Sequence, residues 1–196
     1  MYPSLKEEYD YENIHDWSSH SKIWNIPTPY PHGYLKKLYD YVIQHKPKTI
    51  VEFGSGWGST TIYMRKAQET YGGELYSREL DTEKYDGARK NFSDYKILDT
   101  IYYYNESYDV YFDDPFEFDL LYIDVHNEGF RVNKILQNDF IQKMIKEKKH
   151  ILFEGGSDER NNIATSRGGS SFKIIEHDYE LIYGNQNDRH TLSRLC

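Results

Sequence analysis

The sequence predicts an α/β domain with a doubly wound, mostly parallel sheet, helices on both faces and a C-terminal antiparallel hairpin. Three observations lead to this fold class. Short apolar segments alternate along the chain with segments of helical periodicity, which is typical of a parallel sheet. A glycine-rich turn joins the first of these strands to the helix that follows it. The chain of 196 residues has the length of a single domain.

The predicted elements begin after an irregular N-terminal region. Residues 1–33, with three prolines between Ile26 and Pro31, read as an arm or cap, and residues 34–196 form the main domain. A first helix runs from Tyr34 until Pro47 ends it. Further helices are predicted at 59–70, 83–92 and 133–148, and strands at 49–53, 74–78, 100–104, 118–123, 150–154, 179–183 and 190–195. We expect a loop or one short helix at 105–117 and a polar, glycine-containing loop at 155–171.

Charge and composition exclude several classes of partner. The 24 basic and 32 acidic residues give a net charge of −8, which repels nucleic acid and anionic lipid. The aromatic content of 16% argues against disorder. The single cysteine, Cys196, cannot form an internal disulfide, and the N-terminal residues lack the apolar core of a secretion signal. We therefore expect a cytoplasmic protein that binds a small molecule and neither nucleic acid nor membrane, with a homodimer left open.

Ligands of a parallel sheet bind at the edge formed by the carboxyl ends of its strands. The residues that follow each strand are therefore the candidates for a site. They are Gly54–Gly58, Glu79, Asn105–Ser107, Asp124–His126 and Glu154–Asp158.

The segment from Glu52 to Thr60 contains three glycines at alternate positions. Glycine there permits positive φ and lets a ligand approach the backbone. The dinucleotide fingerprint would need its third glycine at position 59, which is a serine. The pattern, with an acid two residues before the first glycine, resembles motif I of class I S-adenosylmethionine-dependent methyltransferases. The resemblance implies a Rossmann-like domain that binds this cofactor through Glu52, Gly54, Ser55, Gly56, Trp57, Gly58, Ser59 and Thr60, with the acid near the methionine end.

Two further segments extend the resemblance over residues 49–154. Glu79 follows the second strand, where a carboxylate can accept hydrogen bonds from both hydroxyls of a ribose. Asp81 is the rival for this role, but it is better placed as a cap for the next helix. The segment Phe118 to Asp124 resembles the fourth strand of the family, whose terminal acid faces the methyl-transfer site. Asn105, after the third strand, completes the predicted cofactor site.

The resemblance implies a methyltransferase, and the acidic, short chain favours a small-molecule acceptor, methylated at oxygen. Methyl transfer needs an in-line geometry and a group that removes a proton. Asp124, His126 and Glu154 are the catalytic candidates, and His126 has the ordinary pKa best suited to a base near neutral pH. It can also be a loop histidine bonded to backbone. Arg160 and Arg167 can bind an anionic acceptor or can be ordinary surface residues.

Metal dependence and catalysis itself remain open at this point. The segment from Asp124 to Phe130 resembles one that holds Mg²⁺ in some O-methyltransferases, but catechol-type enzymes place an Asp-Asn pair after the fifth strand. Here that place reads Glu154-Gly155-Gly156-Ser157-Asp158, so a metal is not favoured, although Asp124, Glu154 and Asp158 could form an all-oxygen site. The alternatives are a non-catalytic S-adenosylmethionine-binding domain and another nucleotide- or sugar-modifying α/β enzyme. Residues 24–34 can either close over the cofactor or pack as a simple arm.

Overall fold

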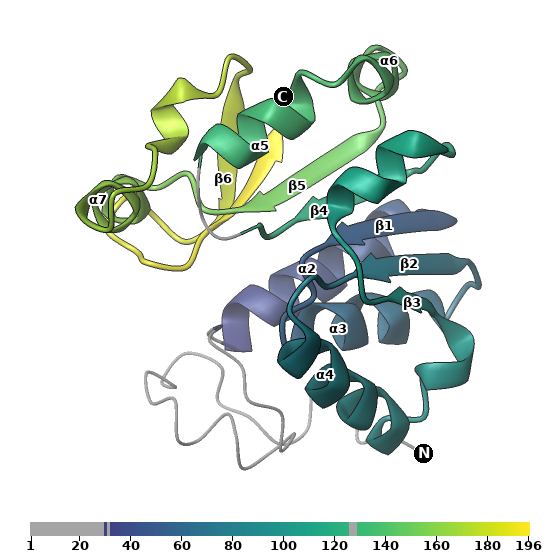
Figure 1. The fold of residues 1–196 in the computed structure, drawn as a ribbon. Coiled ribbons are helices and arrows are strands. Elements are labelled where there is room, and N and C mark those ends of the chain that lie inside the picture. The colour runs from purple at the N-terminus through teal and green to yellow at the C-terminus, as the bar shows by residue number, and fades with distance from the viewer. Residues whose placement is uncertain (1–29, 31, 126–128) are drawn as a thin grey trace.

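The protein folds around one seven-stranded sheet with the strand order β3-β2-β1-β4-β5-β7-β6 (Figure 1). The computed structural model describes residues 30, 32–125 and 129–196. Every adjacent pair of strands is parallel except those that involve β7, which runs antiparallel to β5 and β6. The predicted fold class is therefore confirmed. The strands are β1 (Thr49–Phe53), β2 (Glu74–Arg78), β3 (Tyr102–Tyr104), β4 (Leu120–Ile123), β5 (His150–Glu154), β6 (Tyr179–Tyr183) and β7 (Leu192–Leu195).

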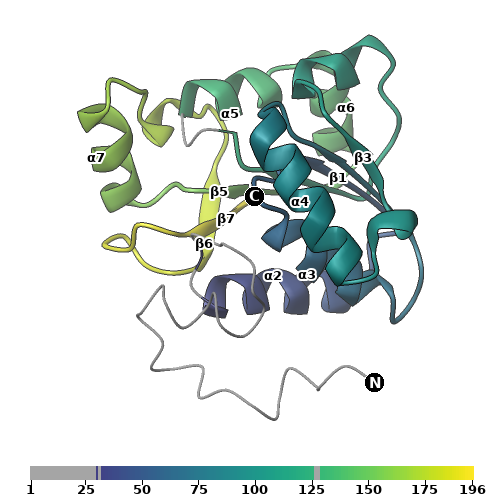
Figure 2. The same cartoon turned by 60° about the horizontal axis from the view of Figure 1, so that its bottom comes forward.

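Helices cover both faces of the sheet (Figures 1 and 2). One face carries α2 (His32–His45), α3 (Ser59–Gln68) and α4 (Thr82–Asp94), and the other carries α5 (Gly129–Leu136) and α6 (Asp139–Lys146). Each face has its own apolar core, because β1 and β4 turn alternate side chains to opposite sides. Among the described residues, no helix has the length and apolar character needed to cross a membrane.

The strand order reverses between β1 and β4, which lie side by side at the centre of the sheet. β1 pairs with β2 on one side and with β4 on the other, with Phe53 opposite Arg78 and Ile123. The connections that leave β1 and β4 therefore diverge at their carboxyl ends, which is where ligands bind in open α/β sheets. The glycine-rich turn after β1 and Asp124 after β4 both lie at this point.

The helix predicted at 133–148 is wrong as a single element, because the structure divides it into α5 and α6. The side chain of Asn138 accepts a hydrogen bond from the backbone N–H of Phe140 at 3.0 Å and caps α6. A capping asparagine favours an extended backbone at its own position, so it ends one helix and begins the next. The apolar periodicity of the sequence continues across this break and therefore does not reveal it.

The loop predicted at 155–171 is also wrong, because it contains the helix α7 (Asp158–Ser166). Ser157 caps this helix by accepting a hydrogen bond from the Arg160 N–H at 3.0 Å, and its own hydroxyl donates to the Asp188 carbonyl at 2.7 Å. The helix is polar and lacks the apolar stripe by which helices are recognised in a sequence. Its first turn points Arg160 toward the sheet.

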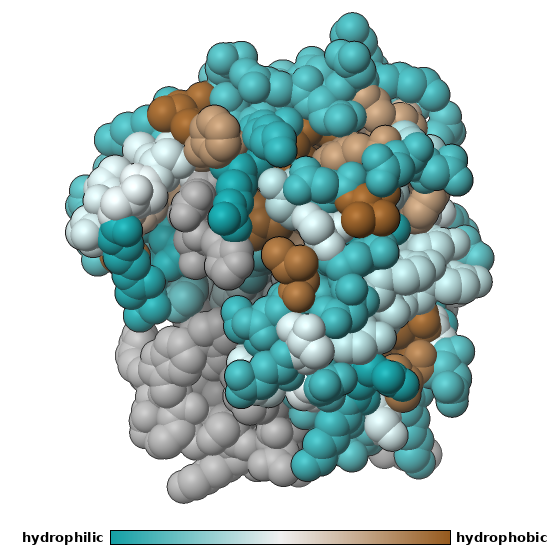
Figure 3. Space-filling model, viewed as in Figure 1, coloured by the Kyte–Doolittle hydropathy of each residue, from teal (hydrophilic) through white to brown (hydrophobic). Residues whose placement is uncertain are grey.

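The surface seen in Figure 3 is mostly hydrophilic, with apolar residues in small, separate patches. Scattered apolar residues of this kind are normal on a folded protein. Leu80 and Phe130 are among the exposed ones. Of these, Leu80 lies two residues after the end of β2 and is therefore at the edge of the sheet where the candidate site is found.

Candidate active site

The turn between β1 and α3 is built from three glycines in the left-handed region, with φ of 87° at Gly54, 55° at Gly56 and 86° at Gly58. A Cβ at Gly54 would lie 2.1 Å from the backbone oxygen of Asp124, and one at Gly58 would lie 2.3 Å from the Phe92 ring. A Cβ at Gly56 would meet no described atom within 4 Å. Gly54 and Gly58 are therefore required by packing, whereas Gly56 borders open space.

Glu79 lies directly beside this open position. One of its carboxylate oxygens accepts the Gly56 N–H at 2.7 Å, and the other accepts the Asp81 N–H at 2.9 Å. The side chain is buried at the sheet edge, between the glycine turn and the start of α4. A carboxylate is thus held next to the backbone of the turn, which is the arrangement that a ribose diol can use.

Two neighbours hold Glu79 in place. The Asn105 amide donates to the Glu79 carbonyl at 2.9 Å, and its own oxygen accepts from the Thr82 hydroxyl at 3.1 Å. Asp81 accepts from the N–H groups of Glu83 and Lys84 and caps α4, as the sequence predicted. Asn105 therefore ties the end of β3 to the segment that carries Glu79.

Glu52 is wholly buried beneath the glycine turn. Its carboxylate accepts hydrogen bonds from the hydroxyls of Thr60 at 2.5 Å, Thr61 at 2.5 Å and Ser77 at 2.6 Å. Burial nevertheless raises the pKa of Glu52 to about 7, because these three donors offset only part of the desolvation. Glu52 fixes the first turn of α3 to the sheet, and its contact with a cofactor stays a prediction.

The other residues of the glycine segment hold the turn in place through contacts with β3 and α4. The Ser55 hydroxyl lies 2.8 Å from the hydroxyl of Tyr103 in β3. The Trp57 ring packs over Gly87 of α4, where a Cβ would come within 2.2 Å of it. Ser59 and Thr60 are buried in the first turn of α3. The segment is therefore anchored to β3 and α4 around Gly56.

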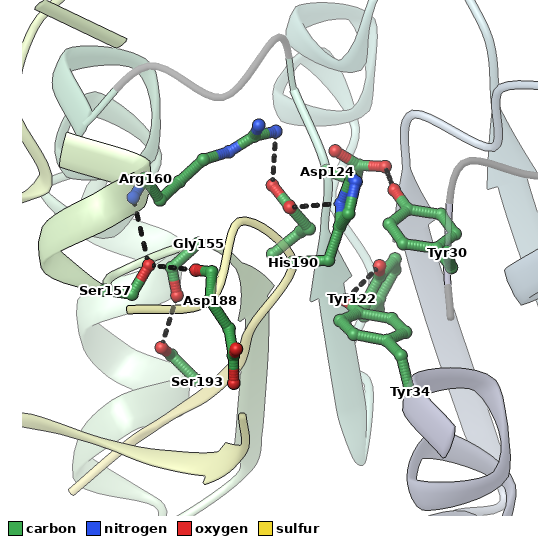
Figure 4. Close-up of polar contacts among 11 residues, drawn as sticks. Tyr30, Tyr34, Tyr122, Asp124, Gly155, Ser157, Arg160, Asp188, His190 and Ser193 are labelled. Carbon is green, nitrogen blue, oxygen red and sulfur yellow. Dashed lines mark hydrogen bonds and ion pairs between the residues drawn. The ribbon is translucent and has the colours of Figure 1, made fainter. Parts of the chain in front are cut away.

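Asp124 and Glu154 lie across the sheet edge from Glu79, at the ends of β4 and β5. Glu154 is wholly buried and Asp124 is partly buried, and the pKa of each is raised to about 7, mainly by desolvation. Repulsion from Glu154 also contributes to the raised pKa of Asp124. The Tyr30 hydroxyl donates a short hydrogen bond to Asp124 (Figure 4).

Two basic side chains meet Glu154 from elements far apart in sequence. Arg160 Nη2 on α7 donates to one oxygen at 2.9 Å, and His190 Nδ1, just before β7, lies 3.3 Å from the other. Figure 4 shows the Arg160 side chain extending from α7 toward His190 and Asp124. Burial, together with Arg160 and Arg189, lowers the pKa of His190 to about 4, so its ring is neutral at physiological pH.

The sequence predicted that Asp124, Glu154 and Glu79 follow strands at one edge of the sheet, but it did not predict all the residues that surround them. It missed His190 and Tyr30, which reach Glu154 and Asp124 only through tertiary folding. Arg160 is a buried partner of Glu154 and not a surface residue, whereas Arg167 is exposed at the end of α7. His126, the preferred base, lies outside the described residues. No signal in the sequence links His190 to Glu154, 36 residues before it.

The residues after β4 and β5 do not fit the divalent metal that part of the resemblance implied. Arg160 and His190 engage the two oxygens of Glu154. Asp158 pairs with Lys173 at 3.0 Å and its side chain is 57% exposed. Within residues 30, 32–125 and 129–196, no group of three or more His, Cys, Asp or Glu side chains could hold a metal ion.

Comparison with known proteins identifies the fold. No protein-family model and no curated protein sequence matches this chain. Many solved structures match, however, and those described as methyltransferases include enzymes for different acceptors. The chain therefore has the α/β fold of S-adenosylmethionine-dependent methyltransferases, as the glycine segment and the strands after it predicted.

Three of these structures give the extent of the likeness. An O-methyltransferase from Bacillus cereus in complex with S-adenosylhomocysteine has 14% identity and a TM-score of 0.62, covering 98% of this chain and 93% of its own. TomG from Streptomyces achromogenes, an O-methyltransferase of tomaymycin synthesis solved with S-adenosylmethionine, has 11% identity and a TM-score of 0.62, covering 98% and 91%. An RNA methyltransferase from Salinibacter ruber in complex with S-adenosylhomocysteine has 15% identity and a TM-score of 0.53, covering 85% and 92%.

Proposed function

We propose that this protein is an S-adenosylmethionine-dependent methyltransferase that acts on a small molecule, at an oxygen atom. The observation that supports the proposal most is the position of Glu79, whose carboxylate lies 2.7 Å from the Gly56 amide nitrogen. Gly56 combines a φ of 55° with open space where a Cβ would stand among the described residues. A carboxylate beside an open backbone turn suits a ribose, and the neighbouring Leu80, 64% exposed, offers an apolar surface to a base.

The two sides of the sheet edge have separate tasks in this proposal. The glycine turn, Glu79 and Asn105 hold the cofactor, which supplies a methyl group on a sulfonium. Asp124 and Glu154 face the acceptor, together with His126, which lies outside the described residues. As the acceptor oxygen bonds to the methyl carbon, the carbon–sulfur bond breaks with its electron pair on sulfur, and a residue of this group takes the hydroxyl proton.

Asp124 and Glu154 are suited to proton transfer because their pKa values are raised to about 7. Groups with a pKa near the working pH exchange protons most effectively. The net charge of −8 favours a small acceptor over a nucleic acid. The fold is shared with an RNA methyltransferase, so this preference rests on charge.

Calorimetric titration with S-adenosylhomocysteine tests the cofactor site. The wild-type chain should bind it, and Gly56→Asn should weaken binding by on the order of tenfold or more, because the new side chain enters the space proposed for the ligand. Asparagine tolerates the left-handed region, so the fold should persist. Gly72→Asn is the matched control, since Gly72 has a φ of 80° and equally open surroundings among the described residues.

The chemistry is tested separately with a methyl-labelled cofactor and a pool of small hydroxylated metabolites. Transfer of label to an ether product supports the proposal. Tight binding of S-adenosylhomocysteine with no transfer to any metabolite pool would instead identify a non-catalytic binding domain. Failure of the wild-type chain to bind S-adenosylhomocysteine would refute the cofactor assignment itself.

A further inference from the structure

We infer that Arg160 takes the place of a divalent cation on the acceptor side of the site, where it balances Asp124 and Glu154 and positions Glu154. The inference rests on the proposed function, because it concerns the acceptor side of that same site. It assigns Arg160 as a positioning residue and makes methyl transfer by this chain independent of a metal ion.

The first step concerns the two acids. Asp124 follows β4 and Glu154 ends the adjacent parallel strand β5, so both acids lie at the same edge of the sheet, Glu154 wholly buried and Asp124 partly buried. Two carboxylates enclosed in this way repel each other and require a positive charge nearby. In proteins that charge comes either from a metal ion or from a basic side chain.

The second step identifies the positive charge. Arg160 is only 2% exposed, and its Nη2 lies 2.9 Å from Glu154 Oε2. It lowers the pKa of Glu154 and also that of Asp124, so its charge acts on both acids. The cap formed by Ser157 fixes the first turn of α7 from which the side chain extends. The charge is therefore built into the fold.

The third step shows why a cation would not share the position. A cation that bound Glu154 would have to displace Arg160 from one carboxylate oxygen and His190 from the other. The next acid along the chain, Asp158, is 57% exposed and pairs with Lys173 at 3.0 Å. A hard divalent cation needs several oxygen ligands, and with Arg160 and His190 on Glu154 the described residues do not supply them.

The Arg160 Nε atom adds an independent observation. It is buried and has no hydrogen-bond partner in the described structure. A buried donor without a partner is rare in folded proteins, so this N–H requires a partner such as a water molecule or a ligand. An acceptor oxygen that carries partial negative charge is the chemical group that would complete the guanidinium's hydrogen bonds, which joins Arg160 to the acceptor as well as to Glu154.

The test adds Mn²⁺ or Mg²⁺ to the full chain. Binding is measured by calorimetry and by the change in melting temperature. Wild type and Arg167→Met should show no saturable binding and no shift. Arg160→Met, which removes the charge but keeps an unbranched side chain, should gain a rise in melting temperature on addition of Mn²⁺. Arg167 is the matched control because it directly follows the same helix but is exposed.

Several results would overturn the inference. One is stoichiometric binding of Mn²⁺ by the wild-type chain that Glu154→Gln abolishes. Another is a folded Arg160→Met variant that does not respond to Mn²⁺. If this variant does not fold, the titrations of wild type and Glu154→Gln decide the question alone. Binding of S-adenosylhomocysteine, measured in the same samples without metal, reports on the proposed function independently of these outcomes.

Discussion

The cofactor side of the candidate site is built from residues 52–81 and one asparagine from the end of β3, whereas the acceptor side draws on segments from Tyr30 to His190. In the first region the site is formed mainly by the backbone. Three glycines with positive φ shape the turn, and Glu79 accepts hydrogen bonds from two backbone N–H groups. In the second, side chains meet side chains: Tyr30 with Asp124, and Arg160 and His190 with Glu154.

Because of this difference, the two regions tolerate different amino-acid substitutions. The turn fails abruptly when Gly54 or Gly58 is replaced, because a Cβ at either position would overlap neighbouring atoms. A buried cluster of charges and hydroxyls fails when one partner is removed and another is left unpaired. Substitutions in the two regions should therefore differ in size and in their dependence on pH.

The largest effect is expected at Gly54. Gly54→Ala would bring Cβ to 2.1 Å from the Asp124 backbone oxygen at a φ of 87°, so β1 and β4 would have to separate at the switch point. We expect a loss of on the order of 4 kcal/mol in the free energy of unfolding, measured with urea. Gly168→Ala, at a φ of 78° and in open space among the described residues, is the control for backbone strain alone. Equal losses in the two variants would show that the strands do not constrain the turn.

The second prediction concerns pH and Glu52. Its pKa is raised from 4.5 to about 7 in the folded state, so the native protein binds more protons than the unfolded chain between these values. The free energy of unfolding therefore falls as pH rises through this interval, by on the order of 3 kcal/mol for this one group. Glu52→Gln cannot ionise and should lose that part of the pH dependence.

Urea unfolding at several pH values, from about 5 to about 8, measures the effect. The stability of Glu52→Gln relative to wild type should increase with pH across this range. Asp124 and Glu154 contribute the same sign of slope to both proteins, so the difference reports on Glu52 together with its repulsion of Asp124. A constant difference would mean that the three hydroxyl donors keep the pKa of Glu52 near its ordinary value.

The third prediction concerns ligand affinity on the cofactor side. Glu79→Gln removes the charge that two ribose hydroxyls would share, and we expect about a tenfold loss of affinity for S-adenosylhomocysteine, or roughly 1.4 kcal/mol. Calorimetry measures the loss, and Glu83→Gln is the control because Glu83 is exposed in the first turn of α4. Unchanged affinity in Glu79→Gln would remove this residue from the cofactor site.

The same contrast explains how much the sequence could predict. The strands at 49–53, 74–78, 150–154 and 179–183 match the structure residue for residue, and Asp81 caps its helix, because these features depend on neighbouring residues. The break at Asn138 and the helix α7 were missed. Prediction of helices from sequence depends on apolar periodicity, which continues across the cap at Asn138 and is absent from α7.

The acceptor side could be predicted only in part. Asp124 and Glu154 were identified because they end apolar strands, and parallel strands bring such residues to one edge. The contacts of Arg160 and His190 with Glu154 were not predicted, because α7 and the segment before β7 reach Glu154 only through the tertiary fold. β7 inserts between β5 and β6, and that insertion carries His190 to the edge.

The smallest predicted effect tests whether the polar contacts of the acceptor side act as pairs. The hydroxyls of Tyr34 and Tyr122 lie 2.7 Å apart and both rings are fully buried. Tyr34→Phe leaves the Tyr122 hydroxyl without this partner, so we expect a loss of about 1 kcal/mol in the free energy of unfolding, and the same for Tyr122→Phe. The double variant buries no hydroxyl at this contact and should lose less than the sum of the two single losses. Additive losses would show that the two hydroxyls do not stabilise each other. The glycines of the turn on the opposite side of the site have no side chains and so form no such hydroxyl pair. Non-additive losses are therefore expected only in the side-chain cluster.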